Sequence, residues 1–335
     1  NIFNQKLLVS FGLRSDMNSF LSDGNNPINS LSPRLSFAYH LNKKIDLTAS
    51  IGRYYKIPTY TTMGYKNEKS EYINKSMKYI QSNHLVLGTQ YLPNEALRFT
   101  FEGFYKQYSN YPISISNGSS LANQGGDFGS IGSEAITSIG EGKTYGFEFF
   151  VQQKLLKRLF YVVSYTFVRS LYSGLDGQLT ASSWDNQHLV SSTLGYKFKK
   201  EWSLGLKYRF AGGNPYTPFD LEISQQNYAL IGTGVLDYKK INSKRLNAFN
   251  QLDFRLDKKI NYKKTTLDIY IDIQNLLLFE QDSAPYYTFK RKDDNSGFET
   301  KDGKSLNVNG SNAIPVILEN KSKNSTPTIG IIFEF

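Results

Sequence analysis

The chain has 335 residues, of which 39% are hydrophobic, and it carries a formal net charge of +10 without any cysteine. The missing cysteines exclude disulfides and thiolate metal sites, and the lack of any run of about 18 apolar residues excludes a transmembrane helix. Lysines and arginines are dispersed rather than gathered in a dense stripe, so nucleic acid is not expected as a partner.

Apolar side chains recur at every second position through most of the chain, which indicates strands because successive side chains of a strand point to opposite faces. The segment 202–210 is typical, since Trp202, Leu204 and Leu206 alternate with Ser203 and Lys207. In chain order, about twelve strands are predicted, at residues 5–14, 34–41, 45–54, 83–91, 97–106, 144–152, 161–167, 188–198, 202–210, 252–257, 267–274 and 328–335.

Short and long connections alternate along this series. Turns of about 3–6 residues, such as 42–44 and 199–201, alternate with long loops, such as 55–80, 111–142 and 279–327. Transmembrane barrels have this asymmetry, with short periplasmic turns and long extracellular loops. A soluble β-sandwich is the alternative, but it does not explain the alternation. The pattern therefore predicts an all-β, antiparallel transmembrane barrel in the cell outer membrane, in contact with its lipid and lipopolysaccharide.

Charged residues of the predicted strands occupy positions opposite the apolar ones. A lysine or arginine at the middle of the lipid-facing surface costs about 2–4 kcal/mol, so these charges are expected to face the lumen. Most are expected to pair across strands or to contact a plug, and the others to line a transport path. The lumen-facing set comprises Arg98, Glu102, Lys106, Glu148, Arg169, Lys207, Arg209, Asp253, Arg255, Asp257, Asp268 and Asp272.

Aromatic residues fall into two groups. Tyrosines and tryptophans at strand ends are typical of the interfacial girdles of a membrane barrel. Four others, Tyr172, Trp184, Tyr216 and Tyr286, fall in the predicted external loops, where aromatic rings can stack on a ligand. These four are the candidate ligand-binding residues.

Catalytic and metal chemistry find little support in the sequence. Gly140–Thr144 is similar to a phosphate-binding loop, but Thr137 stands where the first glycine is required and a strand follows. The histidines at 40, 84 and 188 lie on different strands, and no pair has metal-ligand spacing. No catalytic residue, metal or cofactor is expected, and the protein is not expected to be an enzyme.

Several segments, taken together, carry a family resemblance. They are Ser32–Ser36 with Leu47–Tyr55, then Gly142–Glu148, Trp184–His188, Asn214–Pro218, Asp272–Leu276 and the terminal Ile332–Phe335. In the order and spacing of these segments, across nearly its whole length, the chain resembles the C-terminal half of the barrel of TonB-dependent outer-membrane receptors of the kind found in Bacteroidetes.

The resemblance implies a ligand importer. Such receptors have about 22 strands, so residues 1–335 would form the C-terminal part of the barrel, with the plug, the first strands and the TonB-contacting region upstream. External loops would bind the cargo, whose class stays open between siderophore, glycan, peptide and cobalamin. Phe333 and Phe335 would form the signal read by the barrel-assembly machinery. A SusD-like lipoprotein or other envelope proteins are further candidate partners.

Two other interpretations stay open at this point. The chain could be a receptor-like barrel that serves as a structural or assembly subunit of a larger outer-membrane complex. It could also be a self-contained twelve-strand passive channel or a phospholipase-like enzyme. The second interpretation requires the strand at 5–14 to pair directly with the strand at 328–335.

Overall fold

The computed structural model describes residues 6–125 and 131–335, and it confirms the predicted all-β antiparallel sheet. Gln5, at the expected start of the first strand, lies outside the described residues. Twelve strands follow one another across the sheet, and the short β8 (Leu179–Ala181) pairs with β7 alone. In order these strands are β1 (Leu7–Arg14), β2 (Ser32–Asn42), β3 (Ile45–Lys56), β4 (Ile80–Asn94), β5 (Leu97–Ser114), β6 (Ile136–Leu156), β7 (Leu159–Ser173), β9 (Gln187–Lys197), β10 (Trp202–Ala211), β13 (Phe249–Asn261), β14 (Thr266–Gln274) and β17 (Thr326–Glu334).

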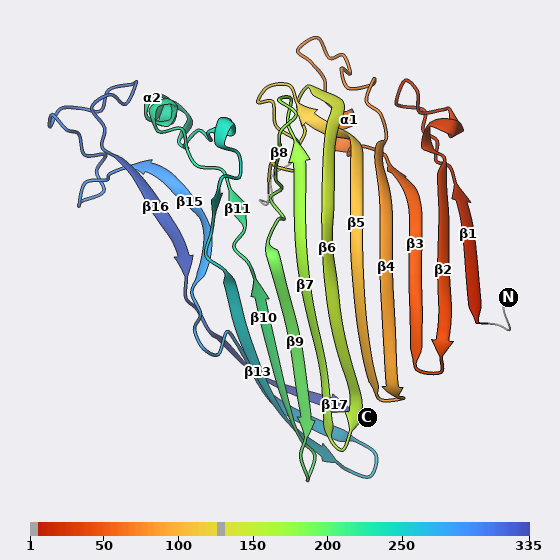
Figure 1. The fold of residues 1–335 in the computed structure, drawn as a ribbon. Helices are drawn as coiled ribbons and strands as arrows, with labels where there is room; N and C mark the ends of the chain where they lie inside the picture. Colours follow the sequence, from red (N-terminus) through yellow and green to blue (C-terminus); the bar gives the residue numbers. More distant parts are fainter. Residues whose placement is uncertain (1–5, 126–130) are drawn as a thin grey trace.

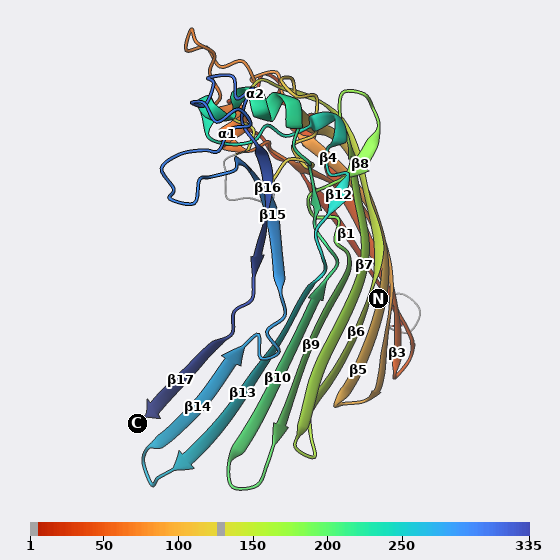
Figure 2. The same ribbon diagram turned by 90° about the vertical axis from the view of Figure 1, so that its left-hand side faces the viewer.

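The sheet is open. The strands β1 and β17 form its two edges, at opposite ends of the strand order, and do not pair with each other within the described residues. The sheet curves strongly between these edges, so that one face is convex and the other concave (Figure 1; Figure 2). The strand pairing therefore gives no support to a self-contained twelve-strand barrel.

Tight turns join the strands at one end. In the β6–β7 hairpin, Lys157 and Arg158 have φ of 47° and 80°, and in the β9–β10 hairpin Lys200 and Glu201 have φ of 59° and 58°. Two consecutive residues with a left-handed backbone conformation form a hairpin turn whose twist matches that of the flanking strands. Because the two-residue turn at 157–158 is this tight, β6 runs to Leu156, beyond the expected end of the strand at 152.

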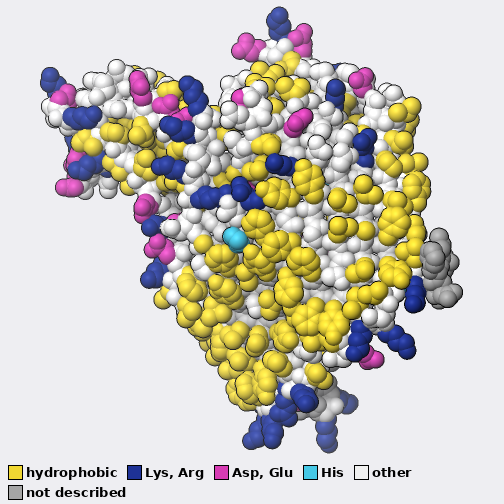
Figure 3. Space-filling view, in the orientation of Figure 1, with side chains coloured by type: hydrophobic (Ala, Val, Ile, Leu, Met, Phe, Trp, Pro, Cys, Tyr) yellow, Lys and Arg dark blue, Asp and Glu magenta, His cyan; other side chains and the backbone are white. Residues whose placement is uncertain are grey.

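The convex face is apolar and exposed. Phe11 is 69% exposed and Ile329 is 75% exposed, on opposite edges of the sheet. Between the edges, rows of directly paired residues such as Ile51, Leu85 and Tyr105 continue the same surface. Apolar side chains cover the lower part of this face, with lysines and arginines at the turns below and along the upper border (Figure 3). A broad exposed apolar band of this kind is what a barrel presents to lipid.

The loop end is more structured than the sequence predicted. The expected loop at 279–327 contains a hairpin of β15 (Gln281–Phe289) and β16 (Pro315–Ser322). The expected loop between 210 and 252 contains the helix α2 (Leu221–Ile231), the turn η2 (Tyr238–Lys240) and the small pair β11 (Pro215–Tyr216) with β12 (Lys244–Arg245). The turn η1 (Pro27–Ser30) and the helix α1 (Tyr60–Met63) lie in earlier loops.

No helix in the described ranges has the length and apolar character needed to span a bilayer.

Two small hydrophobic cores hold these loops. One packs Leu21, Met63, Met77 and Ile136 above the first strands. The other packs Tyr287, Phe289 and Ala313 of the 281–322 region, with Tyr228 of α2 against them. The loop end is thus a folded platform rather than a set of independent loops, and it carries the cavities described next.

Candidate functional site

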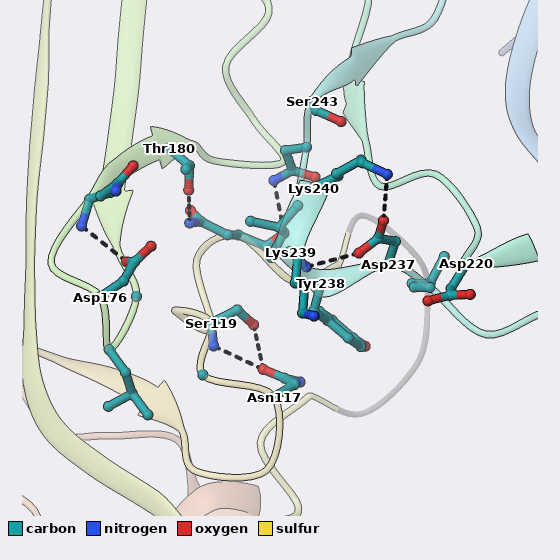
Figure 4. A pocket seen from close by; sticks show the side chains of 18 of the residues that line it. Asn117, Ser119, Asp176, Thr180, Asp220, Asp237, Tyr238, Lys239, Lys240 and Ser243 are labelled. Carbon is teal, nitrogen blue, oxygen red and sulfur yellow. Dashed lines mark hydrogen bonds and ion pairs between the residues drawn. The ribbon is translucent and has the colours of Figure 1, made fainter. Parts of the chain in front are cut away.

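The candidate site is a cleft in the loops at the end of the sheet opposite the tight turns. It has a volume of about 850 Å³ and is lined by three loop segments, 116–123, 174–181 and 220–243 (Figure 4). A cleft of this size is in the range that binds small ligands. None of the four candidate aromatic residues lines it.

Local capping shapes the wall formed by residues 220–243. The carboxylate of Asp220 accepts a hydrogen bond from the Ile223 amide (3.0 Å) and so begins α2, and Gly232, with φ of 68°, ends it. The carboxylate of Asp237 then accepts from the Lys239 amide (3.2 Å) and contacts Lys240 Nζ at 3.0 Å. The side-chain hydrogen bond with Lys240 is the main reason that the pKa of Asp237 lies below its usual value.

Two asparagines lock the three segments together at the base of the cleft. Asn242 Nδ2 donates to the carbonyl oxygens of Asn123 (2.9 Å) and Ala181 (2.8 Å). Asn123 Nδ2 in turn donates to Thr180 Oγ1 (2.7 Å) and to the Tyr172 carbonyl oxygen (3.1 Å). Each loop therefore depends on the other two for its position, and the cleft is built rather than incidental.

The lining combines polar groups with the apolar side chains of Leu175, Leu236 and Ile241, and its charge is nearly balanced. Its charged side chains are three aspartates, at 176, 220 and 237, and two lysines, at 239 and 240. All three carboxylates accept backbone hydrogen bonds within their own loops. The rest of the polar lining consists of hydroxyl and amide groups, among them Asn117, Ser119 and Ser243 (Figure 4). Burial, with the Glu134 charge adding to it, raises the pKa of Tyr238, so the phenol stays a neutral hydrogen-bonding group at physiological pH.

The four aromatic residues predicted to bind ligand lie in different places. Tyr172 and Trp184 line one smaller cavity of about 360 Å³. Tyr172 is 7% exposed and packs at a tilt against Tyr111 with ring centroids 4.5 Å apart, so little of its ring is free to contact a ligand. Tyr216 lies in the β11–β12 pair, and Tyr286 lies on β15, where its hydroxyl accepts a hydrogen bond from Asn320. The structure brings the first two together but not the other two, and their role in ligand binding stays a prediction.

The residues of the predicted lumen-facing set lie on the concave face, with one exception described below. Salt bridges there join Arg255 to Asp257 (2.7 Å), Arg255 more loosely to Asp272 (3.9 Å), and Arg209 to Asp253 (3.3 Å). The remaining members of the set are Arg98, Glu102, Lys106, Glu148, Lys207 and Asp268, which alternate along their strands with the apolar residues of the convex face. Whether they line a transport path stays a prediction.

Arg169 is the exception, and the prediction for it was wrong. It pairs directly with Tyr145, and both residues follow the apolar phase of their strands, so Arg169 faces the convex side. Its position at the loop end of β7 explains why this is tolerated. There Arg169 Nε lies 3.2 Å from Asp185 Oδ1, and the Asp185 side chain is fully buried.

Sequence reasoning missed Arg245, the second partner of Asp185. Arg245 Nη2 donates to Asp185 Oδ2 at 2.5 Å, and Arg245 Nη1 donates to the Gly213 carbonyl oxygen at 3.0 Å. Asp185 also accepts from the Ser170 amide at 2.7 Å, where the pairing of β7 with β9 is interrupted. The segments 184–188 and 214–218, which the sequence singled out separately, thus meet at one structural clamp.

The fold is an open, curved antiparallel sheet with an exposed apolar face and a ligand-sized cleft in its loops, and a family model assigns it to a class of β-barrel proteins. The family model described as "TonB dependent receptor-like, beta-barrel" matches residues 2–276, and the chain belongs to this family. The matches to receptors of this kind imply an outer-membrane location. A comparison of the sequence with curated proteins gives no match.

Solved structures of siderophore receptors have a similar fold. They include the ferric-catecholate import receptor Fiu of E. coli K12 (14% identity, TM-score 0.56), with 90% of this chain and 35% of that chain covered. For the ferric yersiniabactin uptake receptor FyuA of Yersinia pestis the identity is 14% and the TM-score 0.55, with 91% of this chain and 37% of that chain covered. For the siderophore receptor PiuA of Acinetobacter baumannii the identity is 12% and the TM-score 0.56, with 91% of this chain and 36% of that chain covered. The chain therefore spans little more than a third of their length, and the likeness extends to the fold alone.

Proposed function

We propose that this chain belongs to a receptor that imports a ligand across the outer membrane, driven through TonB. The observation that carries the proposal is the family match over residues 2–276 combined with a preorganised cleft in the loops. In transmembrane barrels the long loops are extracellular, so the cleft would meet ligand from outside the cell. The protein acts by binding and transport, without a catalytic step or a cofactor.

We propose that the cleft recognises a ligand that carries both hydrogen-bonding and apolar groups, because Leu175, Leu236 and Ile241 line it beside the polar side chains. Its lining offers hydroxyl, amide and paired charged groups, and the carboxylates are already hydrogen-bonded within their loops. A site of nearly balanced charge favours ligands that exchange several hydrogen bonds over those that bring a high net charge. The aromatic residues Tyr172 and Trp184, in the neighbouring cavity, would add a stacking surface.

We propose that residues 1–335 form the C-terminal part of a plugged barrel of about 22 strands. The chain covers 35–37% of the three receptor structures named above. Among the described residues its sheet has two unpaired edges, which a membrane sheet cannot leave exposed to lipid. On this proposal the contact with TonB lies in a preceding region. A receptor of the Bacteroidetes type with a SusD-like lipoprotein partner is a narrower form of the same proposal.

The second candidate function is a structural or assembly subunit of a larger outer-membrane complex. The ordered platform of α2 and the β15–β16 hairpin favours it, because it presents exposed apolar side chains such as Leu230 (70% exposed) and Val308 (73% exposed). Exposed apolar groups on an ordered surface are typical of protein contacts.

An uptake experiment separates the two candidates. Cells that produce the intact receptor are offered labelled ferric siderophores, oligosaccharides, oligopeptides and cobalamin, with and without a protonophore. Import predicts that one class accumulates only when the proton gradient is intact, and that Asn242→Asp, which removes the donor joining the loops, abolishes its uptake. The variant Asn320→Asp, in the β15–β16 hairpin outside the cleft, serves as the control. No gradient-dependent uptake of any class, together with stable co-purification of other envelope proteins, favours the structural subunit.

A further inference from the structure

An arginine stacked on a tyrosine occurs at two places on the concave face. On β13 and β14, Arg255 Cζ lies 3.9 Å from the centroid of the Tyr270 ring. On β2 and β3, Arg34 Cζ lies 4.4 Å from the centroid of the Tyr54 ring. Both contacts are close enough for a cation–π interaction. The chain thus builds the same stack twice, and the two copies differ in the charges around them.

The Arg255 stack has its own carboxylates, whereas the Arg34 stack has none. Arg255 Nη2 lies 2.7 Å from Asp257 Oδ1, and Arg255 Nη1 lies 3.9 Å from Asp272 Oδ2. Arg34 forms no ion pair among residues 6–125 and 131–335, and its buried Nε has no hydrogen-bond acceptor there. Within the described part of the chain, stacking rather than ion pairing therefore holds this guanidinium.

The row of directly paired residues around Arg34 carries positive charge and no carboxylate. It runs from Arg34 on β2 through Gly52 on β3 and His84 on β4 to Lys106 on β5, and it continues with Thr144 on β6. Neighbouring strands lie about 4.8 Å apart, so the backbones of the two cationic residues are separated by about 14 Å. Lys106, like Arg34, forms no ion pair within the described ranges. A concave wall with charges of one sign attracts counter-ions.

The groups between the two cations hold one another in place. Gly52 is buried, and a Cβ at this position would lie 3.1 Å from Tyr54 Cε2 and 3.3 Å from Arg34 Cγ, so glycine lets the stack lie flat against the wall. On its other side the Tyr54 ring packs against the His84 imidazole, with centroids 4.4 Å apart and 31° between the planes. His84 Nε2 in turn lies 2.7 Å from Ser82 Oγ. Side chains that are already ordered lose little freedom when they bind a partner.

We propose that Arg34 and Lys106 form a binding site for one oxyanion group, a carboxylate or a phosphate, on the inner wall of the barrel. Arg34 is the third residue of β2, so the site lies directly below the loops. The Arg34 guanidinium offers paired donors that match the geometry of an oxyanion, and the Lys106 ammonium adds a second charge. A single oxyanion group is compatible with the nearly balanced charge of the cleft.

Two sources bring this chemistry to the site, and the experiment separates them. One is a ligand that passes from the loops into the barrel, which rests on the proposed import. The other is an acidic side chain of the plug that we propose to precede residues 1–335. Each source leaves a different signature in the intact receptor.

The first measurement is binding of radiolabelled inorganic phosphate to the intact receptor by equilibrium dialysis, with acetate as the competitor. If the ligand supplies the oxyanion, the parent has one saturable phosphate site. Arg34→Gln and Lys106→Gln should each weaken phosphate binding about tenfold, because each removes a charged donor. The matched control is Arg255→Gln, which removes a stacked arginine that already has its carboxylates, and its phosphate binding should equal that of the parent.

The second measurement detects a carboxylate that the receptor itself supplies. A water-soluble carbodiimide condenses Lys106 Nζ with a carboxylate in contact with it to form an amide, and mass spectrometry of the digested receptor identifies the acidic residue. If the plug supplies the oxyanion, the parent shows this cross-link and no phosphate site. The cross-link should be absent from Lys106→Gln and reduced in Arg34→Gln, but retained in Arg255→Gln.

The proposal is overturned if Lys106 forms no such cross-link and phosphate either fails to bind or binds equally to the parent, Arg34→Gln and Lys106→Gln. An equal loss of phosphate binding in Arg255→Gln and Arg34→Gln would also overturn it. Heat-modifiable migration on gels verifies that each variant is folded, and Lys106→Gln carries both measurements if Arg34→Gln does not fold. Neither measurement reads uptake, so this proposal and the import proposal can fail separately.

Discussion

Arg245 and Asp185 lie 60 residues apart in the chain and form an ion pair of 2.5 Å across the loop end of the barrel. The carboxylate is fully buried, and it holds Arg169 and the Ser170 amide as well. This clamp joins the start of β9 to the strand pair that follows β10, and it lies beside the segment that forms one wall of the cleft. Its integrity is therefore expected to govern the stability of the loops more than that of the sheet.

Replacing Arg245 by methionine should destabilise the loop end. The substitution removes the Nη2 donor to the Asp185 carboxylate and leaves this buried group with Arg169 as its one charged partner. Breaking a buried pair in this way costs about 3–5 kcal/mol, and partial exposure of Arg245 reduces the expected loss to roughly 2–3 kcal/mol. Limited proteolysis of the intact receptor should show faster cleavage in residues 210–250, with the sheet still resistant.

The matched control is Arg14→Met. Arg14 Nη2 lies 2.7 Å from Asp16 Oδ1, but the two side chains are 61% and 31% exposed. An exposed pair of this kind contributes below about 1 kcal/mol, so cleavage should stay at the parental rate. Equal protection in Arg245→Met and Arg14→Met would show that the clamp does not stabilise the loops.

The membrane part of the fold could be predicted from the sequence because lipid imposes a simple rule on it. Each spanning strand must place apolar residues at every second position, and the rows through Leu206 or Ile271 keep this period without interruption. The strands continue beyond the membrane, as at Ile136–Gly142 of β6, where Ile136 packs into a loop core and the apolar period of two disappears from the sequence.

The candidate site could not be predicted in the same way. The cleft depends on hydrogen bonds between distant loops, such as Asn242 to Asn123, 119 residues apart. No spacing rule connects such residues. One local signal was present, since Asp220 and Gly232 stand at the two ends of α2 as helix caps. The four aromatic residues did not indicate the cleft, because none of them lines it and Tyr172 packs against Tyr108 and Tyr111 instead.

Leu206 and Ser203 provide a test of which face meets lipid. Leu206 lies on the convex face between Leu194 and Phe254, whereas Ser203 lies on the concave face, opposite Asp257. Leu206→Arg should cost about 2–4 kcal/mol in lipid and lower the folded yield in vesicles. Ser203→Arg should refold nearly as well as the parent, because its charge reaches water and an acidic neighbour. An equal loss of folded yield in the two variants contradicts the assigned faces.

Gly330 gives a second test, within the last strand pair. Tyr270 stands directly opposite, and a Cβ at position 330 would lie 2.2 Å from Tyr270 Cζ. Gly330→Ala should therefore force the ring aside and destabilise the β14–β17 pair by roughly 1–3 kcal/mol. The double variant Gly330→Ala with Tyr270→Leu should recover most of that loss. Equilibrium urea unfolding in vesicles measures the free energy of unfolding of the single and double variants. If the double variant loses as much stability as the two single variants together, the result argues against a clash.

The cleft wall should loosen in acid. The pKa of Asp237 is lowered below its ordinary value of 3.8, chiefly by its hydrogen bond with Lys240. A lowered carboxyl pKa means that the ionised form stabilises the fold above the unfolded-state pKa, and that this contribution is lost as the pH falls through the folded-state pKa. Hydrogen–deuterium exchange in residues 236–243, corrected for intrinsic rates, should rise as the pH falls below about 4. Asp237→Asn should show fast exchange in these residues at all pH values. If exchange in the parent does not rise in acid, the stabilising role assigned to the ionised Asp237 is contradicted.

We propose that Phe333 and Phe335 act during assembly rather than in the folded barrel. Phe333 lies within β17 and pairs with Leu267, whereas Phe335 follows the end of β17 and is 99% exposed. A side chain this exposed contributes little to folded-state packing, so Phe335→Ser should refold in vesicles like the parent. In cells the same variant should reach the outer membrane in lower amount, if the assembly machinery reads the final aromatic residue. The control is Ile332→Ser, which changes a residue of the concave face of the same strand. A normal outer-membrane level of Phe335→Ser, with Phe333→Ser also normal, would remove the assembly role from both residues.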